Sequence, residues 1–221
     1  AALALAGSRA AGLDLAPSDL AILARKGSGS ACRSIHGGIV EWHAGVDDSS
    51  STCQQLVSSD YWDLRVITVI VGEESKEYSS LTGHKAAWTS PLYQARLAAL
   101  DDSLDQLRAS ILTRDFDQFA NITERDTVSM HAIAMTSRID ESPWLSGLYY
   151  WSADTMRLIQ VVQRWRSQGI AVCFSIDAGP NIHLICPADQ LEAVHHALDE
   201  LPVRFRLINH IIGGRACLIT D

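Results

Sequence analysis

A carboxylate set in a tight turn is the feature of this sequence best suited to chemistry. Residues 175–181 read Ser-Ile-Asp-Ala-Gly-Pro-Asn and lie between two apolar runs, residues 169–174 and 182–185. Glycine permits backbone conformations that are closed to other residues, and proline fixes φ and removes an N–H donor. The pattern predicts a hairpin whose tip holds Asp177 at a fixed point. An ordinary structural turn is the alternative, because Asp and Asn favour turns through local hydrogen bonds.

A second candidate is an arginine that follows a stretch of small residues. Residues 26–34 read Lys-Gly-Ser-Gly-Ser-Ala-Cys-Arg-Ser. Small residues let a backbone approach a ligand closely, and a helix beginning here would offer free N–H groups to an anion. Arg33 could bind a carboxylate or a phosphate through two parallel hydrogen bonds. A flexible linker is the alternative, although the strand-like residues 37–42 follow almost at once.

Hydroxyl groups and one histidine complete the set of candidates. Residues 73–82 are charged and rich in hydroxyls, which predicts a mobile loop. Its Ser79, Ser80 and Thr82 are candidate phosphate contacts, with ordinary solvated loop residues as the alternative. His131 stands among small and apolar neighbours, which favours a histidine of the core over a catalytic one.

Composition bounds the class of protein. The 221 residues suffice for one large domain or two small ones, and 47% are hydrophobic while 20% are charged. No apolar run approaches the roughly 20 residues that span a bilayer. The net charge of −8 argues against a general nucleic-acid binder but allows an anionic small substrate. Five cysteines without metal-type spacing predict reduced, mostly buried thiols in a cytosolic protein, and no metal site.

The order of the expected elements indicates an α+β fold, with helices packed on an antiparallel sheet. There is no internal repeat. Apolar periodicity and turn residues predict helices over residues 1–12, 19–25, 91–112, 115–135, 152–168 and 189–201, and strands over residues 37–42, 64–71, 169–174, 182–185, 203–212 and 216–220.

Three of these segments together resemble one known family. Residues 27–34, residues 37–42 and residues 177–181 (Asp-Ala-Gly-Pro-Asn) closely resemble the diphosphomevalonate decarboxylases. Residues 89–92 and 130–132 are similar as well. An arginine motif followed far downstream by an aspartate motif is more specific than either motif alone. The similarity runs from residue 1 to about residue 190 and continues weakly to the end.

The resemblance implies a fold and an organisation. The family belongs to the superfamily of galactokinase, homoserine kinase, mevalonate kinase and phosphomevalonate kinase (GHMP). Its members have a two-lobed α+β fold with the active site in the cleft between the lobes. Residues 1–72 would be the remainder of the N-terminal lobe, with its front part missing, and residues 73–221 the C-terminal α+β lobe. A cytoplasmic homodimer is also expected from the resemblance.

The implied activity is the ATP-dependent decarboxylation of mevalonate diphosphate to isopentenyl diphosphate, with release of ADP, phosphate and CO2, in the mevalonate pathway of isoprenoid biosynthesis. Asp177 would orient or deprotonate the tertiary hydroxyl. Arg33 would hold the substrate carboxylate, and Mg²⁺ would bridge the phosphates of ATP. The substrate-binding residues implied are Ser28, Ser30, Arg33, Ser80 and Thr82.

Departures from the family pattern leave more than one activity open. A Lys-Tyr-Trp segment and a phosphate-binding loop, which relatives carry ahead of the first helix, are not in this sequence. We therefore expect this sequence to be the portion of the enzyme that follows that loop, either as a fragment of a longer chain or as a chain that needs a companion chain. We expect it to have little activity alone, and its ATP-binding residues stay unassigned. His84 stands where many relatives have Met, so phosphomevalonate, giving isopentenyl phosphate, is an alternative substrate. Two more candidates are a mevalonate 3-kinase that does not decarboxylate and a non-catalytic interaction fragment.

Overall fold

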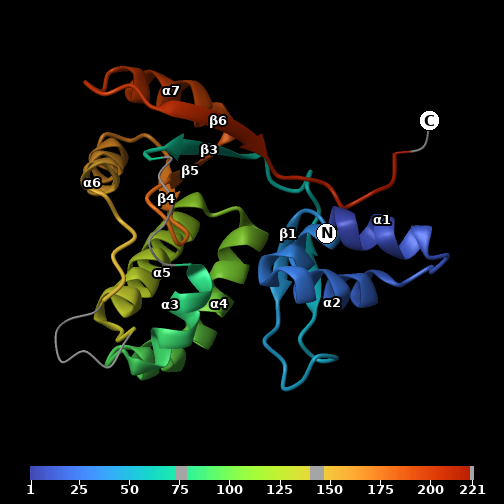
Figure 1. Ribbon diagram of the computed structural model, residues 1–221. Coiled ribbons are helices and arrows are strands. Elements are labelled where there is room, and N and C mark those ends of the chain that lie inside the picture. The colour runs from blue at the N-terminus through green and yellow to red at the C-terminus, as the bar shows by residue number, and fades with distance from the viewer. Residues whose placement is uncertain (73–78, 140–146, 220–221) are drawn as a thin grey trace. The chain divides into compact units, whose positions relative to one another are not determined.

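The chain divides into two units in the computed structural model, which describes residues 1–72, 79–139 and 147–219 (Figure 1). The first unit holds residues 1–63 together with the stretch from residue 211, and the second holds residues 64–210. The expected boundary lay after residue 72. Residues 64–72 instead belong with the second unit, because the strand that they contain pairs in its sheet.

The first unit packs two helices against a short 3-10 helix and a two-stranded sheet. Its elements are α1 (Ala2–Ala10), α2 (Pro17–Gly27), η1 (Gly29–Ile35) and the antiparallel strands β1 (Ile39–Trp42) and β2 (Cys53–Val57). Helix α2 begins with Pro17, whose missing N–H costs nothing there, and ends with basic residues that suit the helix dipole. Its core comprises Leu5, Leu20, Ala21, Ala24, Cys32, Ile35 and Cys53.

The second unit is built on a four-stranded sheet with the order β4-β5-β3-β6, in which β5 runs antiparallel to both β3 and β4. This arrangement confirms the predicted α+β class. Its elements are β3 (Leu64–Ile70), α3 (Ser80–Ala86), η2 (Ala87–Thr89), α4 (Tyr93–Thr113), α5 (Phe116–Thr136), α6 (Ala153–Ser167), β4 (Cys173–Ser175), β5 (Ile182–Pro187), η3 (Ala188–Gln190), α7 (Leu191–Asp199) and β6 (Arg206–Ile211).

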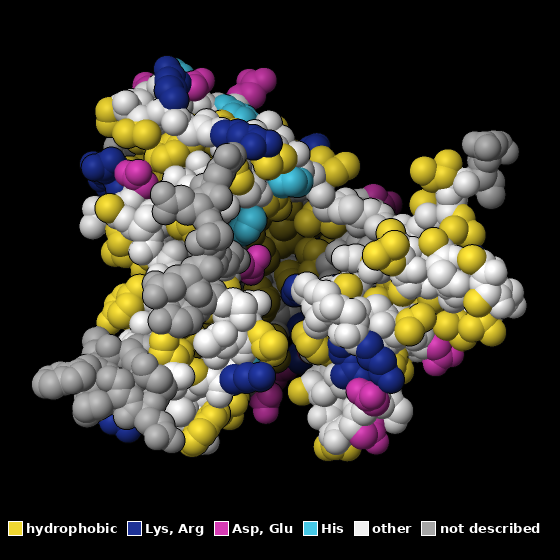
Figure 2. Space-filling view, in the orientation of Figure 1, with side chains coloured by type: hydrophobic (Ala, Val, Ile, Leu, Met, Phe, Trp, Pro, Cys, Tyr) yellow, Lys and Arg dark blue, Asp and Glu magenta, His cyan; other side chains and the backbone are white. Residues whose placement is uncertain are grey.

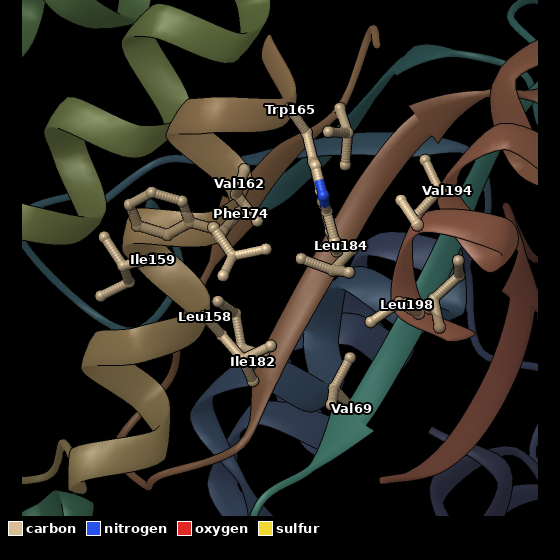
Figure 3. Close-up of a cluster of buried hydrophobic side chains, with 14 of the residues drawn as sticks. Val69, Leu158, Ile159, Val162, Trp165, Phe174, Ile182, Leu184, Val194 and Leu198 are labelled. Atoms are coloured by element: carbon tan, nitrogen blue, oxygen red, sulfur yellow. The ribbon is translucent and has the colours of Figure 1, made fainter. Parts of the chain in front are cut away.

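One face of this sheet forms the main core. Ile67 lies opposite Leu184 and Val69 opposite Ile182 in the β3–β5 register, and all four are fully buried. Apolar side chains of α6 and α7 cover them, as Figure 3 shows. Burial of each such side chain contributes about 1.5–3 kcal/mol, so this layer fixes the strands firmly. Because strand side chains alternate between faces, Thr68 and His183 belong to the opposite face.

Two expected elements differ from the structure. Residues 80–86 form α3 where a loop was predicted, because the Ser79 hydroxyl caps the helix by accepting a 3.2 Å hydrogen bond from the N–H of Thr82. Residues 73–78 of that predicted loop lie outside the described residues. A strand expected over residues 216–220 is absent from its described part. The chain after β6 instead runs along the first unit, where Gly38 N–H donates to the carbonyl oxygen of Gly213.

The predicted burial of most of the cysteines is confirmed. All five cysteines are free, and Cys32, Cys53, Cys173 and Cys186 are buried whereas Cys217 is exposed. Among the described residues, no helix combines the length and the apolar character that crossing a membrane requires.

Candidate functional site

Asp177 lies at the tip of the hairpin that joins β4 to β5. Ser175 pairs with His183 across the two strands, and the turn between them is closed by a 2.8 Å hydrogen bond from Gly179 N–H to the carbonyl oxygen of Asp177. The side chain of Asp177 is 92% exposed. The predicted hairpin is therefore confirmed, with the carboxylate presented to solvent.

The start of helix α6 holds one side of this turn. Ser152 caps the helix, and Ser152 and Thr155 form a reciprocal capping box. The Thr155 hydroxyl also donates a 2.6 Å hydrogen bond to the carbonyl oxygen of Pro180. The local sequence that begins the helix thus also fixes the turn.

A buried histidine holds the other side. His131 of α5 is fully buried, and its Nε2 lies 3.1 Å from the carbonyl oxygen of Ile176. A carbonyl only accepts, so Nε2 carries the proton. Burial lowers the pKa of His131, which keeps the ring neutral, and the ring packs on Trp151 with 4.7 Å between centroids. The predicted core histidine is confirmed, and its hydrogen bond positions the residue before Asp177.

Asn181 closes the turn on the side of β3. Its Oδ1 accepts hydrogen bonds from the backbone N–H groups of Val71, at 2.9 Å, and Gly72, at 3.4 Å. These groups follow the end of β3 and would otherwise lack a strand partner. Together with Thr155 and His131, Asn181 gives the turn three anchors, so the backbone that carries Asp177 is rigidly placed.

One neighbour of Asp177, His183, was not predicted from the sequence. The Nε2 atom of His183 lies 3.8 Å from Oδ2 of Asp177, and its Nδ1 lies 2.9 Å from the hydroxyl oxygen of Thr68. The available signal was weak: Thr68 and His183 are single polar residues flanked by apolar neighbours in their strands.

A pocket of about 290 Å³ opens beside the turn, and Ala178 forms part of its wall. Ser80 and His84, which lie four residues apart on α3, line it together with Tyr150. The predicted Ser80 thus lies next to the hairpin. The hydroxyl of Thr82 instead lies 3.1 Å from that of Ser79.

Arg33 belongs to the first unit, where η1 carries it into a pocket of about 390 Å³. Within the described residues its guanidinium has no hydrogen bond or ion pair, so it is available to a ligand. Gly37 and Gly38 also line this pocket, with φ values of +70° and +71°. A Cβ atom on Gly38 would lie 2.2 Å from the carbonyl oxygen of Val57, so only glycine fits.

The two predicted serines of the first unit flank the start of η1. The hydroxyls of Ser28 and Ser30 are 3.5 Å apart and exposed. Between them Gly29 lies against the Trp42 ring, where a Cβ atom would come within 3.3 Å. Because residues 29–35 form this helix, the flexible-linker alternative is wrong. Ser28, Ser30 and Arg33 lie close together in the sequence of the first unit, whereas Asp177 and Ser80 belong to the second.

Two family models match the chain. The mevalonate 5-diphosphate decarboxylase C-terminal domain matches residues 66–211, and the diphosphomevalonate decarboxylase-like N-terminal domain matches residues 1–53. The human diphosphomevalonate decarboxylase is 36% identical over 171 residues, which cover 74% of this chain and 41% of that protein. The enzyme of Ganoderma lucidum is 32% identical over 193 residues, which cover 82% of this chain and 46% of that protein. The chain thus spans less than half the length of these relatives.

Solved structures agree with these matches. A structure described as MDDEF in complex with MVAPP, AMPPCP and magnesium has a TM-score of 0.83 at 31% identity, over 93% of this chain and 61% of that one. The mevalonate diphosphate decarboxylase from Staphylococcus aureus gives a TM-score of 0.82 at 30% identity, over 91% of this chain and 60% of that one.

Proposed function

Because this chain belongs to the mevalonate 5-diphosphate decarboxylase family, we propose that its protein decarboxylates mevalonate diphosphate at the expense of ATP. The products are isopentenyl diphosphate, ADP, phosphate and CO2. The observation that carries the proposal is the exposed carboxylate of Asp177 on a turn that is anchored by His131, Thr155 and Asn181.

The chemistry needs a base at a fixed place. A tertiary hydroxyl is a poor leaving group, so ATP first phosphorylates it, and this step depends on alignment and charge neutralisation. Asp177 accepts the hydroxyl proton as the bond from oxygen to phosphorus forms. Departure of phosphate then leaves an electron-deficient carbon, and the neighbouring carboxylate is lost as CO2.

Arg33 has the role of holding that carboxylate. A guanidinium matches the two oxygens with two parallel hydrogen bonds, which fixes the direction of the breaking bond. The absence of any ion pair of Arg33 among the described residues supports this role. Ser28 and Ser30, on the same short segment, supply hydroxyls to the substrate.

Ser80 and Thr82 are proposed contacts of the phosphate tail. Ser80 lines the pocket beside Asp177, which supports a direct contact. The hydroxyl of Thr82 is hydrogen-bonded to that of Ser79 at the start of the same helix, and it contributes to phosphate binding through this hydrogen bond. His84 lines the same pocket, and this observation keeps phosphomevalonate as the second candidate substrate.

ATP and Mg²⁺ are the proposed cofactors. Within the described residues no three His, Cys, Asp or Glu side chains are grouped to hold a metal ion. This fits Mg²⁺, which is usually bound by nucleotide phosphates with one or two carboxylates rather than by a protein cage. The ion supplies charge neutralisation at the transferred phosphate. A homodimer in the cytoplasm completes the proposal, and light scattering of the purified protein tests the dimer.

The decisive experiment gives the full-length protein ATP, Mg²⁺ and each phosphorylated mevalonate in turn, and measures ADP and CO2 separately. We expect CO2 from mevalonate diphosphate in step with ADP, and almost none from the Asp177→Asn variant, which should still bind the substrate. ADP without CO2 would identify a 3-kinase, and CO2 mainly from phosphomevalonate would identify the alternative substrate. If neither product forms and the protein binds no nucleotide, the non-catalytic interaction fragment is the remaining candidate.

A further inference from the structure

We propose that His183, held by Thr68 and His210, is a positioning residue that orients the carboxylate of Asp177 for proton abstraction. This inference rests on the proposed function, because it assigns a supporting role around the same base. It arises from a row of polar side chains on the sheet face opposite the main core.

The row crosses three neighbouring strands. His210 of β6 places its Nε2 atom 3.2 Å from the hydroxyl oxygen of Thr68 on β3, and Nδ1 of His183 on β5 lies 2.9 Å from the same oxygen. The row then reaches Asp177, whose Oδ2 is 3.8 Å from Nε2 of His183. Figure 2 shows histidine side chains exposed on the part of the second unit that carries β6 and α7.

For a neutral His183 ring, counting protons selects one arrangement of the row. The Thr68 hydroxyl has one hydrogen to donate and can accept others. If it donates to Nδ1 of His183, then His183 carries its proton on Nε2 and directs an N–H group at Asp177, while His210 donates its Nε2–H to Thr68. The opposite arrangement would direct a nitrogen lone pair at a carboxylate, which is repulsive. The negative charge of Asp177 therefore favours the first arrangement.

The middle of the row is shielded from solvent, whereas its two ends, His210 and Asp177, are exposed. Thr68 is buried, with 8% of its surface exposed, and the His183 side chain is 29% exposed. Thr68 and His183 are also direct partners in the antiparallel register, so the strands themselves bring the two together. A hydroxyl fixed in the sheet thus sets both the ring orientation and the tautomer of His183.

The consequence concerns the side chain of Asp177 rather than its backbone. The three anchors place the turn, but a 92% exposed carboxylate can still rotate. An N–H group beside Oδ2 favours one rotamer and leaves Oδ1 free for the substrate hydroxyl. At 3.8 Å the contact is longer than a hydrogen bond, and we expect it to shorten when the substrate is bound.

The test compares matched variants for turnover of mevalonate diphosphate by the full-length protein. Thr68→Val keeps the shape and removes the hydroxyl, and Thr68→Ser restores it. We expect Thr68→Val and His183→Leu to lower kcat about tenfold while KM changes less than about twofold. Thr68→Ser should recover most of the rate. His195→Gln is the control, because His195 pairs with Asn209 instead.

A second readout does not depend on turnover. Two-bond ¹H–¹⁵N spectra report the tautomer of each histidine, and His183 should carry its proton on Nε2. Thr68→Val should disturb that signal while His195 stays unchanged. A proton on Nδ1 of His183, or full kcat in Thr68→Val, would overturn the inference. Turnover that survives Asp177→Asn would instead overturn the proposed function, so the two failures are distinguishable.

Discussion

Thr155 and Pro180 are joined by a 2.6 Å hydrogen bond that couples the start of helix α6 to the turn carrying Asp177. The Thr155 hydroxyl donates to the Pro180 carbonyl and accepts from the N–H of Ser152 at 3.2 Å. One side chain therefore satisfies a helix end and a turn at once. Loss of the Thr155 hydroxyl should lower the stability of the protein and disturb the position of Asp177.

The first prediction concerns this hydroxyl. Thr155→Val keeps the shape but leaves the part-buried Pro180 carbonyl and the backbone N–H of Ser152 without their partner, so we expect it to cost about 1–3 kcal/mol of stability. Urea unfolding measures this cost, and kcat should fall more than KM rises. Thr155→Ser is the matched control and should retain most of the stability and most of kcat. Equal stability of the Val and Ser variants would show that the bond contributes nothing.

The second prediction concerns the geometry of Arg33. Arg33→Lys keeps the positive charge but cannot form two parallel hydrogen bonds with a carboxylate. We expect kcat/KM for decarboxylation to fall by at least about tenfold. Arg9→Lys is a suitable control, because Arg9 pairs with Asp14 in the same unit. An unaltered rate in Arg33→Lys would remove Arg33 from the mechanism.

The third prediction concerns pH. Burial lowers the pKa of His131 below its ordinary value of 6.5, so below that pH the unfolded chain binds more protons than the folded one. The free energy of unfolding should therefore fall as pH drops through about 6.5. Urea midpoints at several pH values measure this.

A control isolates the contribution of His131. His131→Gln should be less stable at neutral pH but should lose this part of the pH dependence. His196→Gln should keep it, because the side chain of His196 is 78% exposed. The prediction is wrong if the slope between pH 7 and pH 5.5 is the same in His131→Gln as in the original protein.

Local patterns were sufficient for much of the fold. The 3.6-residue period of apolar side chains predicted α4 and α5 to within a few residues, and the pair of glycine and proline predicted the hairpin around Asp177. These features depend on neighbours in the chain, so a single sequence contains them. The α+β class followed from their order.

Features that depend on distant segments were not predictable in this way. Thr68, His183 and His210 lie on three strands, and only the order and register of the sheet bring them together. The boundary between the units was placed too late for the same reason, since β3 joins its sheet through pairing with β5. The strand expected after residue 215 was wrong because tertiary contacts with the first unit replaced pairing with β6.

The last prediction concerns the five cysteines. Burial, with Cys32 beside it, raises the pKa of Cys53 to about 12, and burial raises the pKa of Cys186 to about 11 and that of Cys173 further still. The thiolate is the reactive form, so these buried thiols should be inert at pH 8. Of the five cysteines, Cys217 alone is exposed. In the folded protein we therefore expect fast reaction of Cys217 with a disulfide reagent, and reaction of all five thiols only after unfolding in denaturant.

The matched variant for this prediction is Cys217→Ser, which should remove one fast equivalent. A second fast equivalent from this chain that persists in Cys217→Ser would mean that one of the buried thiols opens to solvent in the folded state. Mass mapping of the labelled peptide would then identify the less stable core, because Cys32 and Cys53 belong to the core of the first unit and Cys186 to that of the second.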